Sequence, residues 1–271
     1  MADCYITRTG SFLPGKAIDN EGIGRYLGKM LGEAKVRQKI LKANGIKSRH
    51  YALDEQQNIT HSTYELAAKA VEDCLSQSAG VKADYLSAGS THTPLLAPGL
   101  ASLLHDELSQ KKLIDYTIEI NSNSGICSSG AQAFVNASRA IRSGDVKAGI
   151  CVGVEQPSVA LRSKAFRPTY DLFRIFKDLR SSQWFMATFL RFMLSDGAGA
   201  WLLEPHPTQA HSLKVDWCYS RSFANEAPLC MQLPSQAPLV LRQDVNILSQ
   251  YIGPLSERMV EEALEVRGKS R

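Results

Sequence analysis

The chain has 271 residues, of which 44% are hydrophobic and 21% are charged, and its formal net charge is +4. This composition excludes disordered and fibrous proteins, and so mild a charge does not favour a nucleic-acid-binding protein. The N-terminal stretch lacks the apolar segment of a signal peptide, and no run of about 18 apolar residues suits a membrane span. The sequence therefore predicts a cytoplasmic protein that does not enter membranes.

The first half of the chain alternates between helical and strand-like segments. Ser62 and Glu65 have the spacing of a capping box, and apolar residues follow at helical intervals. After this helix the sequence predicts a strand over 84–90, a helix over 100–108, a strand over 115–121, a helix from just after Cys127 to Gly144, and a strand over 148–154. Strands joined by helices at this spacing predict an α/β fold with a parallel sheet buried on both faces.

The cysteines and histidines of the sequence do not have the spacing of a metal site or of a disulfide framework. Six cysteines are scattered without a C-x-x-C pair, at Cys4, Cys74, Cys127, Cys151, Cys218 and Cys230. His206 and His211 lie beside prolines in a poor geometry for a metal. We therefore expect no metal and no other cofactor. Asp196, in a turn before a glycine-rich strand, is expected to be a structural hydrogen-bond partner and not a catalyst.

Cys127 lies in the stretch "SNSGICSSGAQAF", at the predicted turn from a strand into a helix. Ligands bind outside the carboxyl ends of such strands, and the start of a helix favours negative charge. A low thiol pKa is therefore expected there, and Gly125 and Gly130 would leave room for an acyl group to approach. The alternative is a small buried cysteine in a tight turn. We interpret Cys127 as a candidate nucleophile.

The stretch "GICSSGAQAFVNASRAIRSGDVKAGICVGVEQPS" resembles the active-site region of β-ketoacyl-acyl-carrier-protein synthases of type III, which belong to the thiolase-like superfamily. The segments "ITRTGSFLPGKAIDNEGI", "ILKANGIKSRHYA" and "FMLSDGAGAWLLE" match the same family in the same order, so the resemblance covers about residues 5–205. The segments "APGLASLLHDEL" and "FLRFMLSDGAGA" are similar to ketosynthases of aromatic polyketide pathways such as dialkylresorcinol synthesis. The resemblance implies a thiolase-like fold of five αβαβα layers built from two similar halves.

The resemblance also implies a reaction and its partners. An acyl thioester would transfer its acyl group to Cys127, and a second thioester would then attack that group in a Claisen condensation. The donor would be an acyl carrier protein or an acyl-coenzyme A. The positions aligned with the family's adenine-binding residues are Lys39 and Ala43, which favours a carrier-protein donor. The full-length protein would be a homodimer.

The second half of the expected fold is incomplete in the sequence. Residues 1–205 would form the first half, and residues 206–271 would begin the second, with a strand over 213–224 and a long helix before the C-terminus. The family's catalytic histidine and asparagine cannot be assigned and would lie beyond residue 271. We therefore expect a truncated and inactive condensing enzyme. The alternative is a non-catalytic ketosynthase-like subunit of a heterodimer.

Residues 161–192 are an insertion relative to the family. They contain seven Lys or Arg, two Asp and eight of the 21 aromatic residues of the chain. One interpretation is a lid whose basic face meets an acidic carrier protein. The other is an amphipathic hairpin that covers the core or a dimer interface, as the spacing of Leu172, Phe176 and Leu179 indicates. The two interpretations are compatible.

Overall fold

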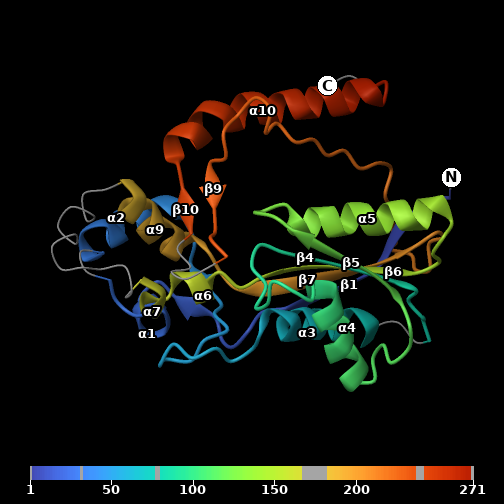
Figure 1. Ribbon diagram of the computed structural model, residues 1–271, viewed down its shortest axis with the longest axis horizontal. Coiled ribbons are helices and arrows are strands. Elements are labelled where there is room, and N and C mark those ends of the chain that lie inside the picture. The colour runs from blue at the N-terminus through green and yellow to red at the C-terminus, as the bar shows by residue number, and fades with distance from the viewer. Residues whose placement is uncertain (1, 31–32, 77–79, 167–181, 236–240, 270–271) are drawn as a thin grey trace.

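The computed structural model describes residues 2–30, 33–76, 80–166, 182–235 and 241–269. Its centre is a six-stranded sheet with the order β5-β4-β6-β7-β1-β8, between α3 and α4 on one face and α5 on the other (Figure 1). The strands are β1 (Tyr5–Phe12), β4 (Tyr85–Ser90), β5 (Glu119–Ser124), β6 (Gly149–Glu155), β7 (Gly197–Glu204) and β8 (Leu213–Lys214). The covering helices are α3 (Thr63–Ser76), α4 (Leu100–Gln110) and α5 (Ser129–Ser143).

The remaining described elements lie outside the six-stranded sheet. Two two-stranded ribbons pair β2 (Ile18–Asp19) with β3 (Ser48–Arg49) and β9 (Met231–Gln232) with β10 (Arg242–Gln243). The other described helices are α1 (Ile23–Leu27), α2 (Ala34–Asn44), α6 (Ser158–Leu161), α7 (Ser163–Phe166), α9 (Ser182–Met193) and α10 (Val245–Val266).

The predicted parallel pairing is confirmed for β4, β5 and β6, and the sheet as a whole is mixed. β4 is parallel to both β5 and β6, whereas β7 is antiparallel to β6 and to β1. Glu155, the last residue of β6, pairs with Gly197, the first residue of β7. The chain therefore re-enters the sheet at the edge where β6 ends, and β7 must run back beside it.

Two predicted strands have different bounds in the structure. The strand expected over 115–121 begins only at Glu119, because its neighbour β4 begins at Tyr85, which pairs with that residue. The strand expected over 213–224 is limited to β8, whose two residues pair with the start of β1. Beyond Val215 the chain leaves the sheet and finds no further strand partner, so the prediction was wrong for most of this segment.

The predicted helices on either side of the sheet are confirmed. At the start of α3, the Ser62 N–H donates to the Glu65 carboxylate over 2.6 Å, and the Glu65 N–H donates to the Ser62 hydroxyl over 3.3 Å, which is the expected capping box. The apolar face of α3 joins β4, β6 and β7 in the largest buried cluster of the protein. α5 ends at Gly144, whose φ of 89° is the left-handed conformation that suits a helix cap.

A second apolar cluster lies beside the carboxyl end of β6 and is built by α1, α2, α6 and α9. Its buried members include Ile23, Leu27, Leu190 and Phe192. The described parts of the 161–192 segment therefore cover a core, in agreement with one of the two interpretations. Residues 167–181, which hold Leu172, Phe176 and Leu179, lie outside the described residues, so the hairpin and lid interpretations of that part are not tested.

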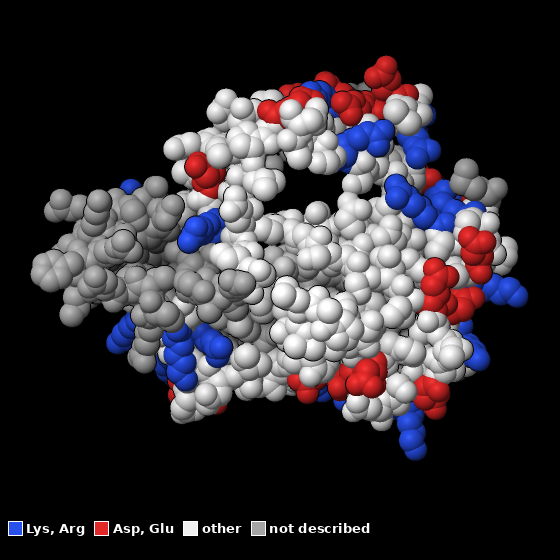
Figure 2. Space-filling model, in the orientation of Figure 1, with Lys and Arg blue, Asp and Glu red and all other residues white. Residues whose placement is uncertain are grey.

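The long helix predicted near the C-terminus is confirmed as α10. Asp244 caps it, because its carboxylate accepts hydrogen bonds from the N–H groups of Asn246 and Ile247 over 2.9 and 3.1 Å. α10 lies above α5 and apart from the sheet (Figure 1). Figure 2 shows that the molecule is hollowed beneath α10 and that most side chains around this hollow are uncharged. Among the described residues, no helix combines the length and the apolar character needed to cross a membrane.

Candidate active site

Cys127 lies between the end of β5 at Ser124 and the start of α5 at Ser129, as the sequence predicted. Its φ of 61° is in the left-handed region, which non-glycine residues rarely adopt. The turn is fixed on both sides, because the Ser129 hydroxyl donates to the Gly125 carbonyl over 3.0 Å and the Ser128 N–H donates to the Ile126 carbonyl over 2.8 Å. Strained backbone of this kind persists where its surroundings hold it, and it is frequent at functional sites.

Glycines allow the start of α5 to lie directly on the sheet. A Cβ atom at Gly89, in β4, would lie 2.1 Å from the Ser129 carbonyl oxygen. A Cβ atom at Gly130 would lie 3.1 Å from the Cα of Gly153 in β6. Gly130 therefore favours close packing of the helix on β6, and it also lines the cavity next to Cys127. Gly125 fits the prediction of room for an acyl group, since a Cβ atom there would lie 3.9 Å from its nearest neighbour, the Ser128 hydroxyl.

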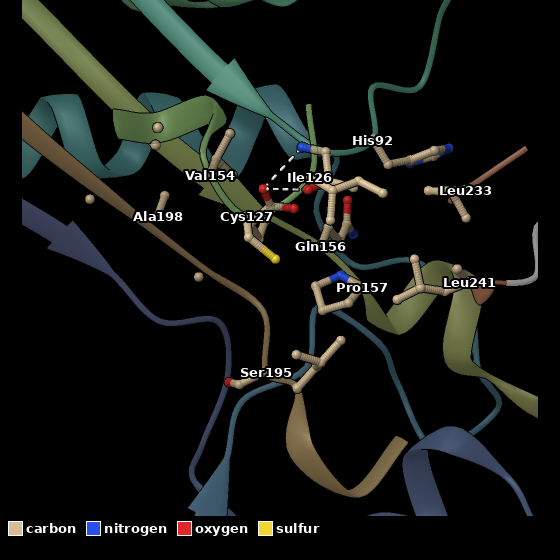
Figure 3. A pocket seen from close by; sticks show the side chains of 18 of the residues that line it. His92, Ile126, Cys127, Val154, Gln156, Pro157, Ser195, Ala198, Leu233 and Leu241 are labelled. Carbon is tan, nitrogen blue, oxygen red and sulfur yellow. Dashed lines mark hydrogen bonds between the residues drawn. The ribbon is translucent and has the colours of Figure 1, made fainter. Parts of the chain in front are cut away.

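Cys127 opens into a cavity of about 480 Å³ between the sheet and the second apolar cluster. The sulfur points into this space, toward Pro157 (Figure 3). Leu194, Leu233 and Leu241 line the far wall. The cavity is lined mostly by apolar groups, so it suits an apolar chain attached to a thioester.

The environment raises the pKa of the Cys127 thiol, which corrects the expected lowering. The causes are burial against the cavity wall, the nearby Glu155 carboxylate and Cys230, in that order. A negative charge on the sulfur is disfavoured by each of these neighbours. Cys127 is still exposed, whereas Cys4, Cys74 and Cys151 are buried. The accessible thiol is therefore distinguished by its position and not by a low pKa.

Glu155 is a cavity residue that the sequence interpretation missed. It ends β6, and one oxygen of its carboxylate accepts hydrogen bonds from both the N–H and the hydroxyl of Thr91, each over 2.9 Å. Burial raises the pKa of this carboxyl, although the bonds from Thr91 oppose the rise. In the sequence, an acidic residue after an apolar run indicates only that a strand ends there. Thr91 is 64 residues away, so nothing in the local sequence predicts its contact with Glu155.

His92 is the histidine that lines the cavity in the described part of the chain, and no asparagine lines it there. Burial lowers the pKa of its imidazole. In Figure 3 the His92 ring extends away from the Cys127 sulfur, toward the side where Leu233 lies. In this arrangement His92 does not serve Cys127 as a proton acceptor.

Asp196 is buried and ties three segments together, as the sequence interpretation expected. Its carboxylate accepts hydrogen bonds from the Ala52 N–H over 2.7 Å, the Ser158 N–H over 3.0 Å and the Ser158 hydroxyl over 2.5 Å. Burial nevertheless raises the pKa of Asp196 to about 6. In the described part of the chain, no group of three or more His, Cys, Asp or Glu side chains could hold a metal ion.

Comparisons with known proteins show which families the chain is similar to. Residues 54–174 match the thiolase N-terminal domain. The β-ketoacyl-[acyl-carrier-protein] synthase III of Xanthomonas oryzae pv. oryzae is 30% identical over 153 residues, which are 55% of this chain and 42% of the relative. The corresponding protein of Xanthomonas campestris pv. campestris is 29% identical over the same length. The matched region thus spans less than half of the length of these relatives.

Solved structures share the fold over nearly the whole chain. The tetronic acid condensing enzyme AbyA1 has a TM-score of 0.72 and 24% identity, over 98% of this chain and 75% of its own. OleA of Xanthomonas campestris has a TM-score of 0.73 at 15% identity, and the 3-oxoacyl-(acyl carrier protein) synthase III of Pseudomonas aeruginosa has 0.67 at 18%, each over 98% of this chain and 72% of its own. The chain therefore has a thiolase-like fold and is similar in sequence to the β-ketoacyl-acyl-carrier-protein synthases III.

Proposed function

We propose that this chain is an acyltransferase that takes an acyl group from a thioester onto Cys127, as the first step of a β-ketoacyl synthase type of condensation. The observation that carries the proposal is the position of Cys127. Its sulfur is exposed at the bottom of a strained turn and points into an apolar cavity of about 480 Å³. A cysteine nucleophile divides carbon–carbon bond formation into two acyl transfers, of which this site supports the first.

The proposed donors are thioesters of an acyl carrier protein or of coenzyme A, in keeping with the names of the relatives in Xanthomonas. Lys39 and Ala43, the positions considered for adenine binding, are both exposed on α2. Neither side chain can stack an adenine ring as an aromatic residue would. We therefore favour a carrier-protein donor. The homodimer, the cytoplasmic location and the division of the chain near residue 205 stay predictions.

The condensation step needs further groups that stabilise a carbanion. The described lining of the cavity has one histidine, whose ring extends away from Cys127, and no asparagine. This observation favours the second candidate function, a non-catalytic ketosynthase-like subunit of a heterodimer. The two candidates differ in one property, since only the acyltransferase becomes acylated on Cys127.

The test is intact-protein mass spectrometry after incubation with octanoyl-acyl-carrier protein. We expect a mass increase of one octanoyl group on the wild-type chain and on Cys230→Ala, and no increase on Cys127→Ala. Cys230 is a matched control because it is also partly exposed and lies next to the cavity residue Met231. An adduct that persists in Cys127→Ala would contradict the assignment, and a wild-type chain without an adduct would favour the non-catalytic subunit.

A further inference from the structure

The charge of Glu155 is not explained by the packing of β6. The residues before it, from Ile150 to Val154, are apolar and mostly buried, and Glu155 itself is only partly exposed. No Lys or Arg is among the described residues that line its cavity, so no cation compensates the carboxylate there. A partly buried carboxylate without a cationic partner costs free energy, and such groups are frequent at functional sites.

The hydrogen bonds of Glu155 leave one of its oxygens available. Both bonds from Thr91 end on Oε1, and Oε2 accepts none from the described residues. Thr91 thus fixes the orientation of the carboxylate while Oε2 keeps its full acceptor capacity. Because Glu155 and Cys127 line the same cavity, the available oxygen and the thiol face one space.

Glu155 and Cys127 also act on each other electrostatically. The carboxylate raises the pKa of the thiol, and burial raises the pKa of the carboxyl. Two negative charges so close together are unfavourable, so the pair is most stable with one proton between them. The other titratable groups that face the pair are His92, beside Thr91, and Cys230, beside β9.

We propose that Glu155 accepts, directly or across one water molecule, the proton that the Cys127 thiol loses when its sulfur attacks an acyl thioester. This inference rests on the proposed function. The S–H bond of Cys127 breaks as its sulfur bonds to the acyl carbon, and the proton moves to the carboxylate. The bond from the acyl carbon to the donor sulfur then breaks, and Glu155 returns the proton to the departing thiolate. The products are acyl-Cys127 and a free donor thiol, and Glu155 is again ionised.

The competing explanation is that Glu155 only anchors the segment after β4. An anchor needs an acceptor for Thr91 but no charge, so glutamine would serve equally well. Glu155→Gln therefore separates the two roles, because its amide oxygen can still accept both hydrogen bonds from Thr91. Glu119→Gln is the matched control, since Glu119 is an exposed carboxylate at the first residue of β5, which β4 separates from β6.

The experiment measures two reactions of Cys127 in the 271-residue chain. The first is acyl transfer from octanoyl-acyl-carrier protein, and the second is alkylation by iodoacetamide as a function of pH. For Glu155→Gln we expect acyl transfer to fall by roughly 100-fold, the contribution typical of a general base. Alkylation should shift to lower pH and become faster at pH 7, because a charge that opposes the thiolate is gone. Glu155→Asp should retain more acyl transfer than Glu155→Gln, and Glu119→Gln should match the wild type.

Slower acyl transfer together with faster alkylation at pH 7 is the result that we expect only if Glu155 accepts the proton. Acyl transfer that is unchanged or faster in Glu155→Gln would overturn the proposal, as would unchanged alkylation or an equal fall of both reactions. If Glu155→Gln does not fold, Glu155→Asp provides the test. The proposal would be overturned if Glu155→Asp transferred the acyl group at least as fast as the wild type at every pH. A wild-type chain that takes no acyl group would refute the proposed function itself and this inference with it.

Discussion

The sulfur of Cys127 is set apart from the buried cysteine sulfurs by access and backbone conformation. Its φ of 61° places the side chain at the tip of a turn, and the cavity leaves the sulfur exposed. Because its pKa is raised, most molecules carry a neutral thiol at pH 7. A nucleophile of this kind must lose its proton during the reaction and not before it. The proton transfer that we propose thus accounts for both the raised pKa of Cys127 and the nearby Glu155 carboxylate.

Asp196 shows what a buried carboxylate costs when it serves structure alone. Its pKa is about 6 in the folded protein, compared with an ordinary value of 3.8. The folded state therefore binds the proton more tightly than the unfolded state, and the stability associated with this group is greatest below pH 4 and is lost as the pH rises through 6. The shift corresponds to about 3 kcal/mol of the free energy of unfolding.

We predict that Asp196→Asn removes this pH dependence, because asparagine has the same size and does not titrate. The free energy of unfolding of the wild type, relative to that of Asp196→Asn, should fall by about 2 kcal/mol from pH 4 to pH 7. Urea unfolding of both proteins at several pH values in this range measures the difference. A difference that stays constant across the range would show that Asp196 is not the buried titrating group.

The start of α5 is placed by glycines in the strands below it. We predict that Gly89→Ala destabilises the protein by about 1–3 kcal/mol, because the new Cβ would lie 2.1 Å from the Ser129 carbonyl oxygen and the helix must move. The movement would displace Cys127, two residues before Ser129, so acyl transfer should fall by roughly 100-fold.

Gly253, inside α10, is the matched control for this substitution. No atom lies within 4 Å of a Cβ placed there, so Gly253→Ala should leave acyl transfer unchanged and stabilise the helix by up to about 1 kcal/mol. Urea unfolding and the octanoyl transfer assay measure both variants. Gly89→Ala with the stability and the activity of the wild type would mean that α5 does not depend on close contact with β4.

Helices and strands that are marked by a local sequence pattern were predicted correctly. The capping box at Ser62 and the apolar run after Gly149 gave α3 and β6 nearly within their observed bounds. The direction of β7 could not be predicted, because strand pairing depends on where distant segments re-enter the sheet. The prediction of a strand over 213–224 was wrong for a related reason, since only its first two residues pair with another strand.

The same distinction applies to the candidate site. Cys127 was found because its small neighbours and the following helix form a local pattern in one stretch of sequence. Glu155 and Thr91 were missed because their contact joins the end of β6 to the segment after β4. The raised thiol pKa was also missed, since the start of a helix is visible in a sequence and a neighbouring carboxylate from another strand is not.

The cavity lies where two apolar clusters meet, one on the sheet and one built by α1, α2, α6 and α9. The sheet contributes Val154 and Ala198, and the second cluster contributes Leu241 with Leu194 and Leu233 packed against it. Buried arginines stabilise that second cluster. Arg49 donates to the Phe192 carbonyl at the end of α9, and Arg191 donates to the carbonyls of Leu27, Gly28 and Leu161. The far wall of the cavity is therefore part of a packed unit and not a loose loop.

A chain attached to Cys127 would fill space between these two clusters, so we predict that acylation raises the melting temperature in proportion to chain length. Each buried methylene contributes about 0.8 kcal/mol at most, which corresponds to about 1–2 °C for a protein of this size. Thermal unfolding of the acetyl, butyryl, hexanoyl and octanoyl forms measures the series. Cys127→Ala, treated with the same donors, should show no shift.

Two leucine variants test whether the cavity wall causes the effect. Leu233→Asn places an amide in the apolar wall, so the gain per methylene should shrink, because the chain would then lie against a polar group. Leu213→Asn makes the same change in β8 at a side chain that is 64% exposed, and the gain there should equal that of the wild type. A melting temperature that is independent of chain length, or an equal response of the two variants, would mean that the acyl chain lies outside this cavity.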